Sequence, residues 1–257
     1  MPAAFFGHGS PANTISINRY TRAWGNFAAT LPAPRAILVI SAHWYVAGTR
    51  ISAAPRPPTI HDFNAHFPLP LFDFAYPARG DAELVDRVID LAGPIEVERD
   101  ATTWGIDHGA FSVLAHAFPA ADVPLVALSI DRSKPPAFHY ALAARLAPLR
   151  DEGIFIMGSG NVVHNLELAD PTAGAPAYDW ARRFDERAAN LLAMGDHESL
   201  VNYHRLGPDA RLSVPTPDHY LPLLYAIALQ RSGERVAAIV EGFAFRSGSM
   251  LSVSIGT

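Results

Sequence analysis

Residues 36–44 have the sequence AILVISAHW, in which five consecutive apolar residues lead through Ser41 to a histidine. A strand that is apolar at every position is typical of a parallel or mostly parallel sheet, because helices cover both faces of such a sheet. We therefore predict a strand at Ala36–Ser41. Runs of similar character predict further strands at Ala3–Phe6, Ile95–Glu98, Leu125–Ile130, Ile154–Met157 and Val236–Glu241, with an antiparallel edge strand in Met250–Ile255.

Stretches with helical periodicity alternate with these strands. Asp81–Ala92 carries its apolar residues on one face, as an amphipathic helix does. Ser133 is expected to cap a helix that Pro135 and Pro136 open and that Pro148 ends. Further helices are predicted at Ala177–Met194, Glu198–His204 and Tyr220–Gln230. The pattern indicates an α/β fold with a central, mostly parallel (mixed) sheet flanked by helices, and one domain over residues 1–257.

The composition excludes several classes of protein. The chain has 257 residues, 49% of them hydrophobic and 18% charged, which is too apolar for a disordered protein. A net charge of −5 with Lys134 as the sole lysine argues against nucleic-acid binding. No apolar run reaches the ~20 residues of a membrane span, and residues 1–10 lack a signal peptide, so we expect a cytoplasmic protein.

Histidines follow two of the predicted strands. His8 lies between two glycines in residues 6–11, FGHGSP, and His43 follows the strand Ala36–Ser41. Ligands of open α/β sheets bind beyond the carboxyl ends of the strands, so the two imidazoles can converge there. Because the chain has no cysteine, a metal ion would be held by His, Asp or Glu. The two histidines together predict a metal site.

Three further histidines have informative settings. His219 lies in residues 215–220, PTPDHY, where a rigid loop meets a helix start that Asp218 is expected to cap. His164 follows the strand Ile154–Met157 and is expected in a first helical turn. His108 directly follows Asp107, a carboxylate able to hold it or a neighbour by a hydrogen bond.

The other histidines are assigned mainly structural roles. For His61, in the long aperiodic loop Pro55–Gly80, a substrate contact and a structural role are equally supported. A loop of this length inside a compact domain is usually functional, and this one is expected to wrap a pocket. Its residues Phe63, Phe67, Phe72 and Phe74 would form an aromatic wall of that pocket or simply pack in the core. The residues assigned structural roles are His66, His116, His139, His197 and His204.

Residues 158–160, GSG, match neither a dinucleotide-binding turn nor a P-loop, because they lack a third glycine and a lysine. A hydrolase that uses Ser159, His164 and a carboxylate stays open, although no oxyanion motif accompanies it.

Six motifs occur in order: GHGSP (7–11), SAHW (41–44), TIHDF (59–63), DHG (107–109), GSGN through HNL (158–166) and DHYLP (218–222). Together they resemble the class III extradiol ring-cleavage dioxygenases, and most closely the 4,5-DOPA dioxygenase extradiol branch, which is related to the catalytic subunit of protocatechuate 4,5-dioxygenase. The resemblance extends from His8 to His219, nearly the whole chain.

The resemblance implies a mononuclear non-haem metal site, with Fe(II) for activity and Zn(II) commonly present after purification. His8, His43 and His219 would be the ligands, with His219 where the wider superfamily has a carboxylate. His164 would be the acid/base residue, with a pKa near neutrality, or a fourth ligand. His108 would be a second catalytic histidine.

The implied substrates are a catechol and O2, and the implied product is a semialdehyde, formed by cleavage of the ring bond next to the two hydroxyls. Substrate contacts are expected from Ser10, Trp44, His61 and Phe63. Four arginines are candidates for binding a substrate carboxylate, and the sequence does not choose among them: Arg19, Arg22, Arg50 and Arg56.

Two other functions remain open at this point. Three histidines with an open position also suit a zinc hydrolase in which His164 is the general base. The fold is shared, too, with Memo-type proteins, which bind metal or ligand without catalysis. No nucleic-acid or membrane partner is expected, and a homodimer is one of the oligomeric states that the sequence allows.

Overall fold

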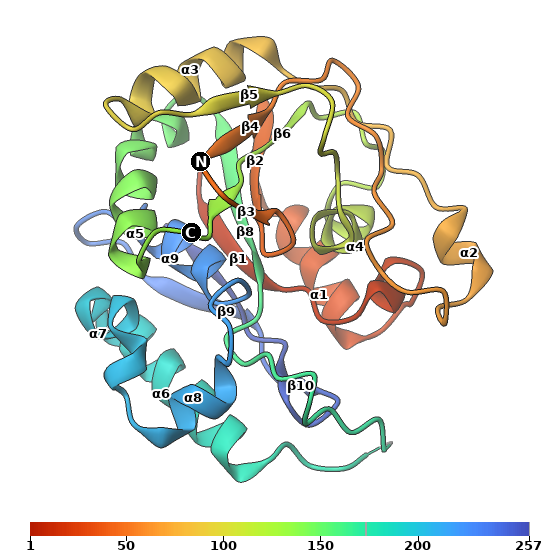
Figure 1. The fold of residues 1–257 in the computed structure, drawn as a ribbon, viewed down its shortest axis with the longest axis vertical. Helices are drawn as coiled ribbons and strands as arrows, with labels where there is room; N and C mark the ends of the chain where they lie inside the picture. Colours follow the sequence, from red (N-terminus) through yellow and green to blue (C-terminus); the bar gives the residue numbers. More distant parts are fainter. Residues whose placement is uncertain (173, 257) are drawn as a thin grey trace.

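The computed structural model describes residues 1–172 and 174–256. Its centre is a six-stranded sheet with the order β6-β2-β8-β1-β12-β9 (Figure 1). β6, β2, β8 and β1 are parallel, and β12 is antiparallel to both of its neighbours. The mostly parallel sheet is confirmed. The strands are β1 (Ala3–Gly7), β2 (Ala36–Ser41), β6 (Leu125–Ala127), β8 (Ile154–Gly160), β9 (Val236–Val240) and β12 (Ser252–Ile255).

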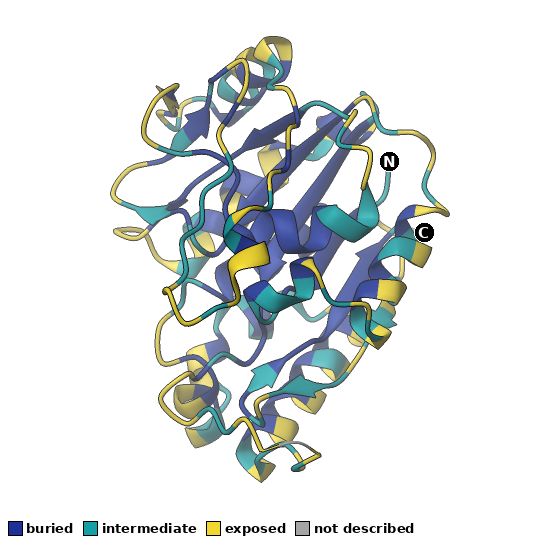
Figure 2. Ribbon diagram, turned by 90° about the vertical axis from the view of Figure 1, so that its right-hand side faces the viewer, coloured by how far each residue is buried: buried dark blue, intermediate teal, exposed yellow. Residues whose placement is uncertain are grey.

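Alternate residues of the central strands enter two different hydrophobic cores. In β1, Ala3 and Phe5 belong to one core, whereas Ala4 and Phe6 belong to the other. This alternation follows from the pleat of a strand that is covered on both faces. The buried sheet runs between the outer helices in Figure 2.

Different helices cover the two faces. The core that contains Phe5 includes residues of α3 (Ala82–Ala92), α5 (Pro136–Arg145), α6 (Asp179–Met194) and α9 (Leu221–Ile227). The opposite core is built on α1 (Arg19–Ala28) and α4 (His108–Ala117), through residues such as Trp24 and Phe111. No helix in the described part of the chain is long and apolar enough to cross a membrane.

Several predicted strands are corrected. β12 lies between β1 and β9, so the antiparallel strand is not the edge. Instead of Ile95–Glu98, the chain forms β5 (Glu98–Asp100), which pairs with β4 (Arg50–Ser52) outside the main sheet. The predicted strand Leu125–Ile130 divides into β6 and β7 (Ile130–Asp131), because the chain leaves the main sheet after Ala127 and pairs with β3 (Tyr45–Val46).

Some helix boundaries also differ. Pro135, not Ser133, is the N-cap of α5, since the Ser133 hydroxyl bonds to Asp131. Pro148 lies within a 3₁₀ turn, η2 (Ala147–Arg150), that follows α5. Glu198–His204 forms α7 (His197–Val201) and η3 (Tyr203–Arg205), and the helix predicted at Tyr220–Gln230 is the shorter α9. The other elements are η1 (Pro11–Thr14), α2 (Leu69–Phe72), α8 (Pro208–Ser213), β10 (Phe243–Ala244) and β11 (Gly248–Ser249).

Candidate metal centre and active site

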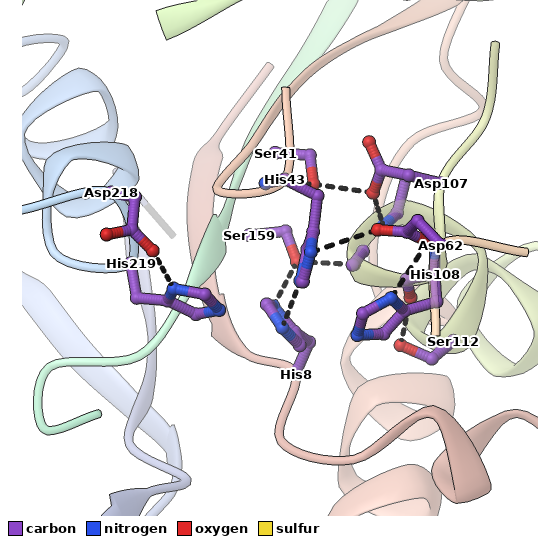
Figure 3. Close-up of polar contacts among 12 residues, drawn as sticks. His8, Ser41, His43, Asp62, Asp107, His108, Ser112, Ser159, Asp218 and His219 are labelled. Atoms are coloured by element: carbon purple, nitrogen blue, oxygen red, sulfur yellow. Dashed lines mark hydrogen bonds and ion pairs between the residues drawn. The ribbon is translucent and has the colours of Figure 1, made fainter. Parts of the chain in front are cut away.

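Three histidines meet beyond the carboxyl ends of the parallel strands (Figure 3). His8 directly follows β1, His43 lies two residues after β2, and His219 precedes α9. The ring centroids of His8 and His43 are 5.1 Å apart, those of His8 and His219 are 5.4 Å apart, and those of His43 and His219 are 5.1 Å apart. The three rings thus form a nearly equilateral triangle.

The end of β8 allows His219 to reach this position. A Cβ atom on Gly160 would lie 2.1 Å from the carbonyl oxygen of His219, so only glycine permits this close approach. The backbone N–H of Asn161 donates a hydrogen bond of 2.8 Å to the same carbonyl oxygen. Glycine is therefore required at positions 158 and 160 because the backbone of residues 219–222, which carries His219, packs directly against the end of β8.

Each of the three imidazoles has a partner at Nδ1. Nδ1 of His8 lies 3.1 Å from the Ser159 hydroxyl, and Nδ1 of His43 lies 2.9 Å from an Asp62 carboxylate oxygen. Nδ1 of His219 bonds to Asp218, which therefore orients the histidine and does not cap α9 as predicted. Metal-binding histidines in proteins are held in this way at the nitrogen that does not bind the ion. The Nε2 atoms of His8 and His43 face each other at 3.2 Å.

Asp62 is the site residue that the sequence analysis missed. Besides its contact with His43, its carboxylate accepts hydrogen bonds of 2.9 Å from both the backbone N–H and Nδ1 of His108. One carboxylate from the loop Pro55–Gly80 thus orients two imidazoles from different elements. Its position next to His61, in the TIHDF motif, was the signal available in the sequence.

Burial dominates the ionisation of the site. It lowers the pKa of His8 well below its usual value, that of His219 to about 4 and that of His164 to about 2, and neighbouring imidazoles add to the effect in each case. Burial is also the largest single effect on the pKa of His43 and lowers it, but the hydrogen bond to Asp62 and the charges of Asp62, Asp107 and Asp218 together outweigh burial, so the pKa is raised. The neutral imidazole, which His8, His219 and His164 keep at neutral pH, is the form that binds metal ions.

Burial would raise the pKa of Asp62 and of Asp218, but hydrogen bonds from the adjacent histidines lower both. The two carboxylates are therefore ionised at neutral pH. Two anions beside the cluster favour a bound cation.

His164 lies in an irregular segment, and not in the predicted helical turn. It forms an antiparallel bridge with Gly248, and its ring stacks on His219 with the centroids 3.5 Å apart. The predicted near-neutral pKa is wrong for the protein without ligand, because burial leaves this imidazole neutral far below pH 7.

A cavity of about 580 Å³ opens over the histidines. Ser10, Phe63 and Phe67 lie in its wall as expected. Its lining also includes His8, His43, Asp62, His108, Asn161, His164, Leu166, Ala169, His219, Ala244 and Phe245.

Two residues predicted as substrate contacts lie elsewhere. Trp44 is buried and stacks on Trp104, with the ring centroids 5.9 Å apart, so it packs in the core. Nε2 of His61 bonds to the carbonyl oxygen of Phe74, which ties the loop Pro55–Gly80 together. Neither residue is among the described residues that line the cavity.

The aromatic wall is smaller than expected. Phe72 packs on His61 and Phe63, and Phe74 packs on Phe111, whereas only Phe63 and Phe67 of the four phenylalanines are among the described residues of the cavity wall.

Among the described residues, two groups have donor atoms close enough to hold a metal ion. One is formed by His8, His43 and His108, and the other by His164, Asp218 and His219. Of the histidines assigned structural roles, His139 bonds to the Tyr225 hydroxyl in the core and His116 bonds to the carbonyl oxygen of Asn13.

Comparisons with known proteins agree with the resemblance drawn from the motifs. The chain is 49% identical over 261 residues to 4,5-DOPA dioxygenase extradiol of Escherichia coli (strain K12), covering 100% of this chain and 95% of that protein. It is 34% identical over 241 residues to the Beta vulgaris protein of the same name, covering 91% and 88%.

A crystal structure of an uncharacterized protein from Escherichia coli K12 matches with a TM-score of 0.87 and 42% identity over 100% of both chains. Residues 8–246 match the family described as the catalytic LigB subunit of aromatic ring-opening dioxygenase. These matches do not favour the zinc hydrolase or the Memo-type binding protein. The chain belongs to the family of the catalytic LigB subunit of aromatic ring-opening dioxygenase, and it is an extradiol ring-cleavage dioxygenase.

Proposed function

We propose that this enzyme holds a single Fe(II) ion with His8, His43 and His219, and that it cleaves a catechol ring next to the hydroxyl pair to give a semialdehyde. The triangle of the three rings carries the proposal. Imidazoles bound to one ion at roughly 2.1 Å, with near-tetrahedral angles, have ring centroids about 5 Å apart. The observed separations of 5.1, 5.4 and 5.1 Å fit this value.

His108 fits a catalytic role better than a ligand role. Its ring centroid lies 3.9 Å from that of His43, which is too close for two imidazoles on one ion with such angles. Since its Nδ1 donates to Asp62, its Nε2 is an acceptor and can bind a substrate hydroxyl.

The donor set is compatible with two metals. Three neutral imidazoles suit Fe(II) and also Zn(II), which we expect to find in the purified protein. Bound Fe(II) would supply open coordination positions for the catechol oxygens and for O2, as in other non-haem oxygenases.

His164 is the proposed acid/base residue. It lies in the cavity wall against His219 and is neutral at pH 7, so it can accept a proton from a catechol hydroxyl and return it later in the reaction. A negatively charged substrate beside it would raise its pKa and so strengthen it as a base.

We also propose that residues 1–257 act as one catalytic domain, since the proposed ligands come from both halves of the chain. A cytoplasmic location is proposed from the sequence alone. A homodimer stays a prediction.

The test is oxygen uptake after metal exchange. The protein is stripped of metal, reconstituted anaerobically with Fe(II) or Zn(II), and assayed with catechol, protocatechuate and DOPA, the last because the relatives from Escherichia coli and Beta vulgaris carry its name. We expect uptake and a yellow ring-opened product with Fe(II) alone, and loss of both in His164→Ala. No uptake with any catechol, although iron is bound, would overturn the proposal.

A further inference from the structure

The cavity has apolar walls on both sides of the histidine cluster. Phe63 and Phe67 come from the loop Pro55–Gly80, which includes α2 (Figure 1). On the other side, Phe245 lies in the turn that follows β10, and Leu166 and Ala169 come from the segment that bonds to this turn. At about 580 Å³ the cavity lies in the range of roughly 300–1,000 Å³ that holds drug-sized ligands. It is therefore much larger than one dihydroxybenzene ring requires.

Phe245 occupies an unusual position at this cavity. It lies in the turn between β10 and β11, where both Phe245 (φ +51°) and Arg246 (φ +63°) adopt the left-handed conformation that non-glycine residues rarely take. Such conformations are unfavourable and cluster at functional sites. The Phe245 side chain is also 45% exposed although it is large and apolar.

Arg246 fixes this turn. Its guanidinium pairs with Asp170 at 2.9 Å, donates to the carbonyl oxygen of Pro176 and lies 4.1 Å from the centre of the Tyr178 ring. These contacts hold the turn in its strained conformation, so that Phe245 stays at the cavity wall. The same contacts occupy the guanidinium of Arg246, so this arginine does not serve as a partner for a substrate carboxylate.

Charged partners for a substrate carboxylate are scarce at this site. Neither lysine nor arginine is among the described residues that line the cavity. Two of the arginines considered as carboxylate partners are engaged elsewhere: Arg19 with the carbonyl oxygen of Glu241, and Arg50 with Glu98. A substrate carboxylate that enters this apolar part of the cavity would lose water without gaining a cationic partner among these residues, at a cost in binding free energy.

Building on the function proposed above, we infer that the preferred substrates are catechols that carry a large, uncharged apolar substituent. The dihydroxylated ring lies over the histidines, and the substituent packs against Leu166 and Phe245. Each methylene that leaves water for such a wall is worth roughly a threefold to fourfold gain in kcat/KM.

The experiment compares kcat/KM of the Fe(II)-loaded enzyme for catechol, 4-propylcatechol, 4-hexylcatechol, 4-isobutylcatechol and DOPA. The isobutyl compound resembles DOPA in shape but carries no charge. We expect kcat/KM to rise from catechol to 4-hexylcatechol, and to be at least tenfold higher for 4-isobutylcatechol than for DOPA. Equal or higher values for DOPA, or a flat alkyl series, would overturn the inference while leaving the ring cleavage itself established. Absence of turnover with every catechol would instead contradict the proposed function.

Variants locate the binding wall. Phe245→Gly relieves the left-handed strain and removes the ring, so the preference for 4-hexylcatechol over catechol should fall by about tenfold. Met194→Ala is the matched control, because Met194 is a 70% exposed apolar side chain at the end of α6. It should keep the wild-type preference. An unchanged preference in Phe245→Gly, with a wild-type melting temperature, would show that the substituent binds elsewhere.

Discussion

Replacing Asp62 by asparagine should weaken metal binding and slow turnover together. The carboxylate accepts hydrogen bonds from His108 and lies 2.9 Å from Nδ1 of His43. Asparagine has nearly the same size but offers one acceptor oxygen and one donor nitrogen. When its oxygen serves His108, its NH₂ group faces Nδ1 of His43, and this histidine loses its partner or changes to the tautomer that carries a proton on Nε2.

The magnitude follows from the bond that is lost. A hydrogen bond to an ionised group contributes about 1.5–3 kcal/mol, which corresponds to roughly 10–150-fold in an equilibrium constant. Removing the partner of a metal-binding histidine typically reduces metal affinity or activity by about 10–100-fold. We therefore expect the Fe(II) affinity of Asp62→Asn to fall by about 10–100-fold.

The assay is anaerobic titration of the metal-free protein against a chromogenic chelator, followed by turnover at saturating Fe(II). Asp218→Asn is the matched comparison, because Asp218 bonds to one imidazole, that of His219, whereas Asp62 contacts two. Both variants should lose metal affinity, but Asp62→Asn should lose more turnover at saturating Fe(II), since only Asp62 also orients His108. Wild-type affinity and turnover in Asp62→Asn would refute this account of the site.

Three other outcomes are expected. His219→Ala should abolish metal retention, as measured by elemental analysis. His164→Ala should retain the metal, but its kcat should fall by about 10²–10⁴-fold. Equal metal loss in the two variants would make His164 a ligand. A Gly-to-Ala change usually stabilises a helix. In Gly109→Ala, however, the new Cβ would lie 2.7 Å from Cδ2 of His43, so both the melting temperature and the metal affinity should fall. Burial raises the pKa of Asp185 from 3.8 to about 7, so the native carboxyl stays protonated where the unfolded one ionises. The contribution of Asp185 to the free energy of unfolding should therefore fall as pH rises from about 4 to about 7, and Asp185→Asn should gain up to roughly 4 kcal/mol relative to the wild type across that range in denaturant titrations.

The sequence predicted the parts of the site that depend on local pattern. His8 and His43 follow strands whose uniform apolarity marked them as buried and parallel, and parallel strands bring their carboxyl ends to one edge. The structure places His219 beside these two histidines, as the resemblance implied.

The remaining parts depend on contacts between distant segments. Asp62 meets His43 and His108 only because an aperiodic loop folds over the strand ends, and no spacing encodes that contact. The bounds of α4 were not predicted, because its first seven residues are all buried and it lacks a polar face. Trp44 adjoins His43 in the sequence, but its buried ring stacks on Trp104 and does not line the cavity, a contact that the sequence does not encode.

The position of β1 in the sheet also sets when the metal site can form during biosynthesis. Ala3, at the start of this strand, pairs with Ile156 on one side and with Ile255 on the other. Contacts so distant in sequence form late in folding. At roughly 5–20 residues per second, a ribosome makes His8 many seconds before the strands that hold β1 in place. A metal ion can therefore be bound only after these distant strands have been made, and the supply of metal to the folded protein would govern how much active enzyme forms.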